Sequence, residues 1–166
     1  MAIHTVIYLP DPRLRLPTKP ITVFDTKLKT LVDDMIETMY HANGCGLAAP
    51  QIGLSLKLAV IDVSDDGTKP FCIINPEIIA TAGRALMKAG CLSVPGAYCE
   101  FERAEKVKVR ALDVDGKSFE IEAEGLLAHC LQHEIDHLNA KLIVDYLSPL
   151  KRQMALKKME KEKRRL

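Results

Sequence analysis

Apolar residues at helical spacing mark the first long element of the chain. They lie between Leu28 and Met39, and either Asp25 or Thr26 stands before them as an N-cap. Gly44 stands where a glycine commonly ends a helix. The stripe consists of Leu28, Leu31, Val32, Met35, Ile36 and Met39. We expect these side chains to face the core rather than a ligand.

Two further helices are expected in the last third of the chain. The first extends from about Gly125 to Asn139, with one apolar side formed by Leu127, Leu131, Ile135 and Leu138. Ser148-Pro149 is typical of an N-cap followed by a first-turn proline, so residues 148–166 are predicted to form a helix as well.

Strand patterns occupy the middle of the chain. Leu56–Val63 and Phe71–Ile74 are short apolar runs, and the second ends at Asn75-Pro76. Residues 106–111 and 119–123 alternate apolar and polar positions across the turn signal Asp115-Gly116, which predicts a hairpin. Strands grouped before helices predict an α+β fold, with small antiparallel or mixed sheets packed around the helix that begins near Gly125.

Composition agrees with an ordinary globular chain. The 166 residues are 48% hydrophobic and 27% charged, which excludes a disordered chain and predicts one domain over residues 1–166. No apolar run approaches the roughly 20 residues of a membrane span. No basic segment followed by a long apolar stretch opens the sequence, so we expect a cytoplasmic protein without a membrane partner.

The charge is concentrated at the C-terminal end. Residues 148–166 carry eight Lys or Arg and two Glu, a net charge of +6, and the whole chain carries +1. The remaining residues therefore carry −5. Such a tail is either a solvated helix that aids solubility or a docking surface for an anionic partner.

The five cysteines do not suggest a disulfide framework. Their number is odd and no C-x-x-C pair occurs. In a reducing compartment, a cysteine near histidines is better interpreted as a metal ligand or a nucleophile.

The strongest chemical signal is the segment His133-Glu134-Ile135-Asp136-His137. Two histidines four residues apart lie about 40° apart on one helix face and can bind one metal ion. Glu134 projects close enough to act on a water beside that metal. His129 extends the series by one turn, but the outer histidines would be about 12 Å apart along the axis, too far for one ion. We therefore expect His129 in a pocket or behind the ligands.

Two histidines leave a metal ion short of protein ligands. The metzincin class, which takes its third ligand from a downstream His, is excluded because Ala140 and Ile143 stand where that class needs Gly and His. No His or Cys follows His137, and the acids that remain are Asp145 and two glutamates of the charged tail. A cysteine from earlier in the chain is therefore expected, and a Cys and two His with an open position suit Zn²⁺ or Fe²⁺. Gly90-Cys91 is the best placed, although spacing alone does not choose among Cys45, Cys91 and Cys130.

Three segments together resemble the peptide deformylases. Gly44-Cys45-Gly46-Leu47-Ala48-Ala49-Pro50-Gln51 is similar to the first motif of that family, Gly90-Cys91-Leu92-Ser93 to the second, and residues 133–137 to the third. They occur in the family's order, and the resemblance covers nearly the whole chain. It implies a hydrolase that removes the formyl group from N-formylmethionyl nascent peptides and releases formate.

The resemblance also implies roles for individual residues. Cys91, His133 and His137 would hold one ion per chain, usually Fe²⁺, with Zn²⁺, Ni²⁺ or Co²⁺ able to replace it. Water on that ion would attack the formyl carbon, and Glu134 would act as general acid and base. The Gln51 side chain and the Leu92 N–H would stabilise the oxyanion. The residues expected to contact substrate are Gly46, Cys45, Met87, Ala89, Gly90, Leu126, His129 and Cys130.

The sequence departs from the family pattern around the expected methionine pocket. The second motif normally begins with Glu, and Ala89 stands there in this chain. That Glu pairs with an arginine in the family, so Arg103 is expected to have lost its partner. His129 occupies a position that is usually apolar. We therefore expect a reshaped, more polar pocket with an altered acyl preference.

Three other functions remain open from the sequence. A zinc peptidase of the H-E-x-x-H type would cut unformylated peptides. A closed structural metal site, or a deformylase-like protein that lost activity and serves as a binding module, would need neither Glu134 nor Gln51. The basic helix at residues 148–166 adds the hypothesis of docking at the ribosome; we expect no DNA partner.

Overall fold

A computed structural model describes residues 2–166 and has the α+β architecture expected from the sequence. All five strands belong to one antiparallel sheet in which neighbours in sequence are neighbours in space, in the order β1-β2-β3-β4-β5. The strands are β1 (Gly46–Ala48), β2 (Leu58–Ile61), β3 (Phe71–Cys91), β4 (Val94–Leu112) and β5 (Ser118–Glu124). No helix within residues 2–166 is long and apolar enough to cross a membrane.

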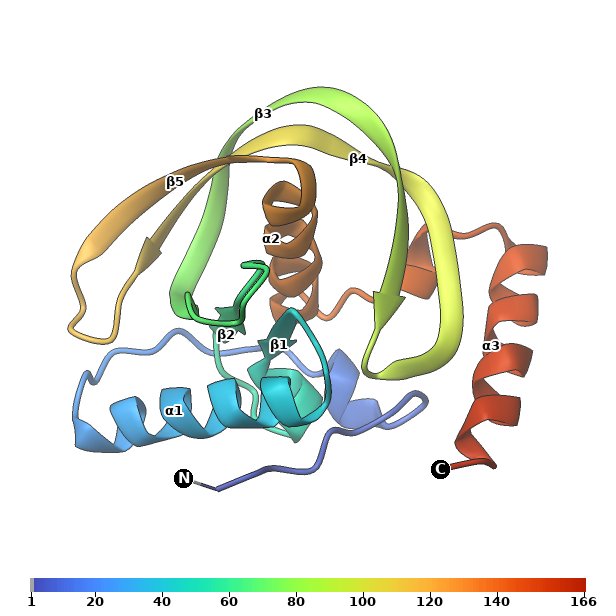
Figure 1. Ribbon diagram of the computed structural model, residues 1–166, viewed down its shortest axis with the longest axis horizontal. Helices are drawn as coiled ribbons and strands as arrows, with labels where there is room; N and C mark the ends of the chain where they lie inside the picture. The colour runs from blue at the N-terminus through green and yellow to red at the C-terminus, as the bar shows by residue number, and fades with distance from the viewer. Residues whose placement is uncertain (1) are drawn as a thin grey trace.

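The two longest strands form a curved ribbon that arches over the molecule (Figure 1). The strand was expected to end at Asn75-Pro76, and this prediction was wrong, since β3 continues to Cys91. A register shift between Ile74 and Glu77 accommodates the proline, and Asn75 adopts a φ of 51° there. The Asn75 side chain bonds the N–H and the carbonyl of Ile21, which compensates for the interrupted ladder.

The predicted hairpin is present. Val107 lies opposite Ala123 and Val109 opposite Ile121, so the apolar positions of β4 and β5 share one face of the sheet. Gly116 adopts a φ of 80° in the turn between them, as a tight turn requires. The hairpin therefore buries one face and leaves charged side chains on the other.

Helix α1 (Thr26–His41) lies beneath the sheet and begins at the expected cap, since the Asp25 side chain accepts a hydrogen bond from the Leu28 N–H. Its apolar stripe packs on β2 and the start of β3. The prediction for its end was wrong in one respect. Asn43, and not Gly44, takes the left-handed conformation there, with a φ of 58°.

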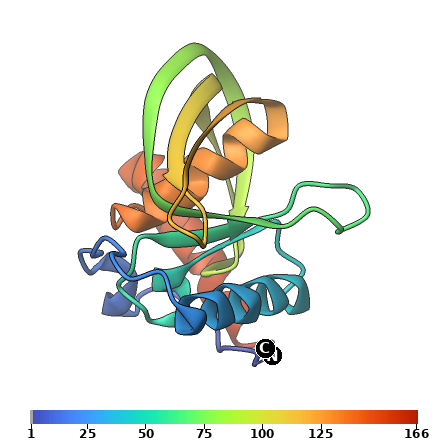
Figure 2. The same ribbon diagram turned by 90° about the vertical axis from the view of Figure 1, so that its left-hand side faces the viewer.

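Helix α2 (Gly125–Leu138) runs beneath the β3–β4 arch (Figures 1 and 2). Its apolar side packs against the concave face of the sheet, and Leu131 is completely buried there. The opposite side of the helix is thereby turned toward the strand ends and the loops. The fold thus presents the histidine side of α2 at a fixed place.

Helix α3 (Pro149–Lys163) lies against β4 at one end of the molecule. The Ser148 side chain accepts from the Lys151 N–H, which confirms the predicted cap. Only Ala155 and Met159 of this helix are buried, and they join the core under the arch. Three short 3₁₀ helices complete the fold, at Pro12–Arg15, Ala49–Ile52 and Ile143–Tyr146.

Candidate metal centre

Three side chains from two elements converge on one point. Cys91 is the last residue of β3, and His133 and His137 lie one turn apart on α2. The Cys91 Sγ lies 3.3 Å from Nε2 of His137, whose Nε2 lies 3.2 Å from Nε2 of His133. All three donor atoms lie within 4.8 Å of one another. The sequence left open which cysteine joins the histidines, and the fold selects Cys91.

These donors fit a four-coordinate cation with one open position. Bonds of about 2.1 Å to nitrogen and about 2.3 Å to sulfur put tetrahedral donors roughly 3.4–3.6 Å apart. The two short donor separations are close to those values. The two imidazole nitrogens, 3.2 Å apart, are close enough to bind the same cation. The donor set suits Zn²⁺ or Fe²⁺.

Burial keeps all three donors uncharged in the absence of a cation. Burial lowers the pKa of His137 to about 3, and burial together with the neighbouring His137 lowers the pKa of His133 well below its ordinary value. Neutral imidazole is the form that binds metal. Burial also raises the pKa of the Cys91 thiol to about 12. A cation would reverse that preference, because it stabilises the thiolate.

The other acids and histidines considered from the sequence lie elsewhere. Asp145 forms a bidentate ion pair with Arg15. His129 lies one turn before His133 on α2, outside the converging group, and its Nδ1 lies 2.9 Å from the sulfur of Met87. Burial, followed by the field of Arg103, lowers the pKa of His129. His129 is thus a neutral pocket residue at neutral pH.

Glu134 is buried beside the histidines and pressed against β1. Its Oε1 has no hydrogen-bond partner within residues 2–166. A Cβ on Gly46 would lie 2.8 Å from Cδ of Glu134 and closer still to Oε2, so only glycine fits. Burial raises the pKa of Glu134 well above its ordinary value, and the Cys45 thiolate adds to the effect. An unpaired buried carboxyl is costly, and such groups are concentrated at reactive sites.

Gln51 is almost completely buried, and its amide has a fixed orientation. Its Oε1 accepts from the Ala48 N–H at 2.9 Å, so its Nε2 must point the other way. That nitrogen donates to Ser93 Oγ at 3.1 Å and lies 3.7 Å from the Cys91 sulfur. The amide donor therefore lies beside Cys91, one of the three metal-binding side chains. Ser93 lies in the second motif, but its role in orienting Gln51 was not predicted from the sequence.

A cleft of about 580 Å³ gives access to these groups. Six of the eight residues expected to contact substrate line it: Cys45, Gly46, Gly90, Leu126, His129 and Cys130. The three residues expected to act in catalysis, Gln51, Leu92 and Glu134, line it as well. Ala89 is not among them. It is buried in the apolar cluster that also contains Ala155 and Met159 of α3. Met87 also lies outside the lining and reaches the cleft only through its contact with His129.

Arg103 pairs with an acid of α2, and not with position 89, where Ala stands in place of the expected Glu. Its Nη1 donates to Asp136 Oδ2 at 2.9 Å, and the Tyr146 hydroxyl donates to the same oxygen at 2.7 Å. The ring of Tyr146 stacks on Phe101 at 4.4 Å, beneath the guanidinium. Within the described chain, Nε and Nη2 of Arg103 have no acceptor. Asp136 therefore links α2 to β4 and to the 3₁₀ helix at Ile143–Tyr146. Tyr146 was not predicted from the sequence because it lies on a different element.

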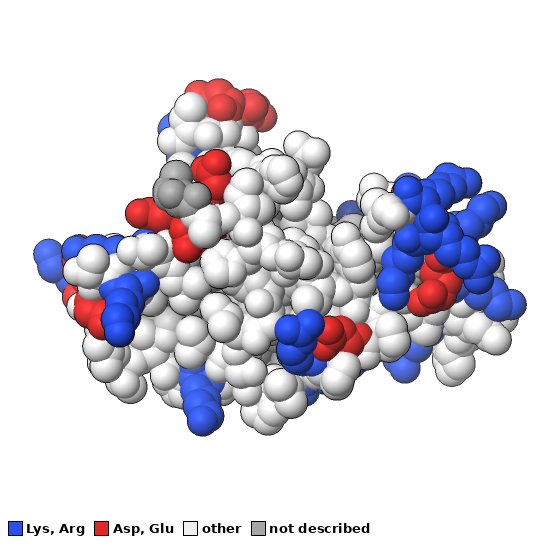
Figure 3. Space-filling view, turned by 90° about the horizontal axis from the view of Figure 1, so that it is seen from below, with Lys and Arg blue, Asp and Glu red and all other residues white. Residues whose placement is uncertain are grey.

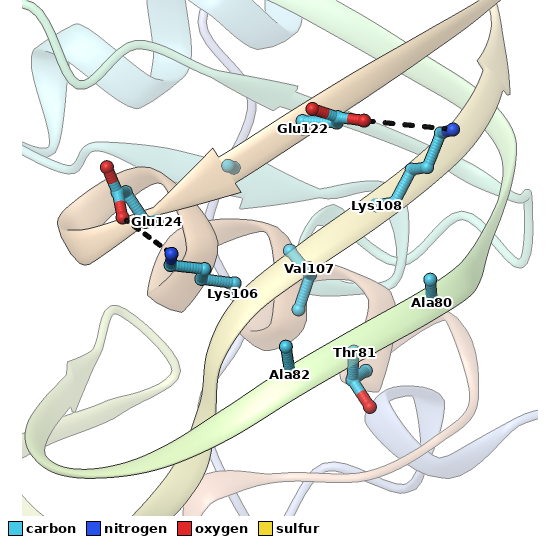
Figure 4. Close-up of a pocket in the computed structure, with 9 residues that line it drawn as sticks. Ala80, Thr81, Ala82, Lys106, Val107, Lys108, Glu122 and Glu124 are labelled. Atoms are coloured by element: carbon cyan, nitrogen blue, oxygen red, sulfur yellow. Dashed lines mark ion pairs between the residues drawn. The ribbon is translucent and has the colours of Figure 1, made fainter.

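A second hollow lies on the outer part of the sheet, across β3, β4 and β5 (Figure 4). Its lysines are already paired, Lys106 with Glu124 and Lys108 with Glu122, each at 3.8 Å. The other residues that line it are Ala80, Thr81, Ala82, Val107 and Ala123. Its charged side chains are held in these ion pairs, and it contains no histidine or cysteine, so we assign it no catalytic role.

Comparison with known proteins gives one consistent result. Residues 3–153 match the model of the polypeptide deformylase family. The peptide deformylase of Azotobacter vinelandii is 54% identical over 165 residues, which is 99% of this chain and 98% of that protein. Peptide deformylase 1 of Shewanella oneidensis is 52% identical over 161 residues, covering 97% and 96% of the two chains.

Solved structures agree in fold. A peptide deformylase from Legionella pneumophila superposes with a TM-score of 0.96 at 60% identity, covering 98% of this chain and 96% of the other. A peptide deformylase from Synechococcus elongatus, solved in complex with actinonin, superposes with a TM-score of 0.90 at 43% identity, covering 95% and 88%.

Proposed function

The chain belongs to the polypeptide deformylase family, and from this premise we propose how the residues of its cleft carry out the reaction. The protein is a hydrolase that removes the N-formyl group from nascent peptides. The observation that carries the assignment of residues is the convergence of Cys91, His133 and His137 beside two oriented polar groups, Glu134 and Gln51. We take residues 1–166 as one catalytic domain.

Enzymes of this family depend on a metal ion, and Cys91, His133 and His137 are the residues that would hold it, one ion per chain. We propose Fe²⁺ as the native ion, with Zn²⁺, Ni²⁺ or Co²⁺ able to replace it, because thiolate and imidazole donors accept all four. When bound, such a cation supplies Lewis acidity and makes water a competent nucleophile near neutral pH.

Glu134 is the proton carrier in this proposal. It is the only acidic side chain among the residues that line the cleft, and its Oε1 has no partner in residues 2–166. It takes a proton from the attacking water at that oxygen and returns it to the amine that leaves. Burial of Glu134 against Gly46 excludes bulk water from this transfer.

Gln51 and the Leu92 N–H are proposed to stabilise the developing oxyanion. The Gln51 amide donor is fixed by Ala48 and points to the Cys91 sulfur, so it needs no reorganisation when charge develops. Leu92 follows Cys91 in the tight turn from β3 to β4 and lines the same cleft.

The peptide is proposed to bind as an added strand. β1 is an edge strand of the sheet and pairs with β2 on one side only. Gly46 begins β1 and lines the cleft, so its backbone is available to an extended chain. This mode recognises backbone and tolerates different sequences after the first residue, as nascent chains require.

The first test is formate release from a formyl-Met-Ala-Ser peptide by anaerobically purified protein, with metal measured in the same sample. Release in proportion to bound metal is expected. Cleavage of the unformylated peptide would instead favour a zinc peptidase. A fully metallated protein that releases no formate would overturn the proposed reaction.

The acyl preference is proposed to depend on His129 rather than on Ala89. His129 lines the cleft, whereas Ala89 faces the core. His129→Leu is expected to raise kcat/KM for formyl-Met relative to formyl-Leu peptides. Ala89→Glu is the matched comparison and should leave that ratio unchanged; a change with Ala89→Glu alone would reverse the assignment.

Docking at the ribosome is proposed for α3 in a cytoplasmic enzyme. Its Lys and Arg side chains gather at one end of the molecule, away from the largely uncharged central face (Figure 3). Truncation is a poor test because Ala155 and Met159 belong to the core. Replacing the exposed Lys157, Lys158 and Lys161 by Gln should reduce co-sedimentation with ribosomes and its salt sensitivity. Unchanged co-sedimentation would overturn the docking proposal.

A further inference from the structure

Two thiols meet in the cleft without belonging to the metal-binding group. The Sγ atoms of Cys45 and Cys130 lie 3.5 Å apart, although the two residues are 85 positions apart in sequence. Both line the cleft that contains Glu134. Neither thiol has a part in the mechanism proposed above.

The two thiols differ in access. Cys45 is exposed, in the loop between the end of α1 and β1. Cys130 is buried behind it on α2, one turn before Glu134. The loop backbone is anchored, because the Cys45 carbonyl accepts from the Asp62 N–H at 2.9 Å. An oxidant from solvent therefore reaches Cys45 first, with Cys130 in contact behind it.

Their environments suit an attacking and a resolving thiol. The hydrogen bond from Cys130 lowers the pKa of Cys45 to about 7, against the opposing effect of burial. The same contact, together with burial, raises the pKa of Cys130 well above its ordinary value. Near neutral pH, Cys45 is thus partly thiolate, which is the reactive form.

The other cysteines provide a contrast. Cys72 and Cys99 are buried in two separate apolar clusters. Burial raises the pKa of both thiols. Buried thiols of this kind are inert core residues. The exposure of Cys45 and the sulfur–sulfur contact set the Cys45–Cys130 pair apart from them.

We propose that Cys45 and Cys130 form an oxidisable dithiol site, which hydrogen peroxide converts to a disulfide that blocks the cleft. The Cys45 thiolate attacks one peroxide oxygen, the O–O bond breaks, and hydroxide leaves. Cys45 is then a sulfenic acid, and the hydroxide takes the Cys130 proton. The Cys130 sulfur attacks the Cys45 sulfur, the S–O bond breaks, and a second hydroxide leaves to be protonated. Two thiols are oxidised by one electron each, and peroxide is reduced to two waters.

The bond requires only a local movement. A disulfide joins sulfurs about 2.05 Å apart, so the two sulfurs must approach by about 1.5 Å, which rotation of the exposed Cys45 side chain can supply. The bridge would tie the loop before Gly46 to α2, one turn from Glu134. Loss of turnover on oxidation rests on the proposed function, whereas formation of the bridge does not.

The first arm of the test is chemical. Nickel-loaded protein, chosen because ferrous iron itself consumes peroxide, is treated with hydrogen peroxide, alkylated and digested. Mass spectrometry should detect a Cys45–Cys130 cross-linked peptide that dithiothreitol removes. Cys45→Ala and Cys130→Ala should each abolish it, and Cys99→Ala should retain it. Peroxide consumption that yields only sulfinic or sulfonic acid at Cys45, or no cross-link at all, would overturn the proposal.

The second arm compares turnover after peroxide with turnover of the same variant before treatment. Turnover of the parent and of Cys99→Ala is expected to fall by about tenfold or more, because small displacements at a reacting site are costly. Dithiothreitol should restore it. In Cys45→Ala, peroxide treatment should lower turnover by less than about twofold relative to the untreated variant, because no bridge can form. A cross-link without loss of turnover would overturn the blocking role. An untreated parent that releases no formate would overturn the proposed function and leave the cross-link result intact.

Discussion

Hydrogen bonds fix two of the polar side chains in and around the cleft, Gln51 and Asp136. Ala48 and Ser93 hold the two ends of the Gln51 amide. Asp136 is held by Arg103 and by the Tyr146 hydroxyl. Glu134 is the exception, because its Oε1 lacks a partner within the described residues and packing alone positions it. A group held by packing stays free to exchange a proton, whereas a hydrogen-bonded amide stays in place.

The role of Glu134 predicts a separation of metal binding from turnover. Glu134→Gln should lower kcat by about 10²–10⁴-fold, because a positioned general acid–base group contributes that much. Metal content should stay close to that of the parent, since Glu134 is outside the converging donor set. Parallel measurement of formate release and bound metal tests this. A large loss of metal would show that Glu134 supports the site rather than the reaction.

The fit of Glu134 against β1 predicts that position 46 tolerates only glycine. In Gly46→Ala the new methyl group would lie 2.8 Å from Cδ of Glu134, so the carboxyl must move. We expect kcat/KM to fall about 10²-fold, since displacements near 1 Å at a reacting group cost that much. In the Gly46→Ala background, Glu134→Gln should lower kcat/KM by a smaller factor than it does in the parent, as a double-mutant cycle would measure. If the two substitutions lowered kcat/KM by independent factors, Gly46→Ala would not act through Glu134.

At the scale of elements, α2 performs two tasks on two sides. Its apolar side packs under the sheet, with Leu131 completely buried. Its other side carries Cys130, His133, Glu134 and His137. Burial of the first side sets the orientation of the second, because a helix cannot rotate without exposing its apolar stripe. The arch of β3 and β4 then supplies Cys91 from the end of a strand.

The N-cap of helix α1 stabilises the fold in addition to the burial of its apolar face. The Asp25 carboxylate accepts from the Leu28 N–H at 3.0 Å. Asp25→Ala should lower the free energy of unfolding by about 1 kcal/mol, the usual cost of losing such a cap. Asp33, an exposed residue of the same helix, provides the matched control, and Asp33→Ala should cause no comparable loss in urea unfolding. Equal effects of the two substitutions would contradict a capping role.

At the scale of the whole molecule, contacts between the two ends of the chain complete the fold. Arg15 in the first 3₁₀ helix forms two hydrogen bonds, of 2.5 and 2.9 Å, with Asp145, which is 130 residues away. The Lys163 ammonium donates to the Leu9 carbonyl at 2.7 Å. These contacts attach the N-terminal segment to the C-terminal part of the chain, including helix α3. The cleft therefore lies among elements fixed from both ends of the chain.

The Arg15–Asp145 pair predicts a pH dependence of stability. Burial raises the pKa of the Asp145 carboxyl, but Arg15 and the Leu142 N–H outweigh it, so the pKa in the folded state lies below its ordinary value. The pair therefore stabilises the fold above the unfolded pKa, near about 4, and this stabilisation is lost as the pH falls through the lower folded value. Arg15→Gln should reduce stability at neutral pH.

The difference between the parent and Arg15→Gln should narrow below about pH 4, as protonation of Asp145 removes the pair from the parent too. Urea unfolding at a series of pH values provides the measurement. A difference that stays constant down to strongly acidic pH would show that Arg15 acts through packing and not through its charge.

Local signals in the sequence determined much of this protein. The cap at Asp25, the proline after Ser148, the hairpin turn at Gly116 and the spacing of His133 and His137 all depend on neighbours within a few residues. The physical preferences that set them are therefore present in the chain itself. The α+β class and the family follow from such signals taken together.

Tertiary structure alone decided which distant residues meet. Local sequence does not reveal that β3 continues past Asn75-Pro76, because Ile21 supplies the bonds that the bulge needs. It does not direct Ala89 into the core, pair Arg103 with Asp136, or bring Cys45 to Cys130. Each of these contacts joins residues whose proximity is created by packing over the whole sheet, and packing depends on every element at once.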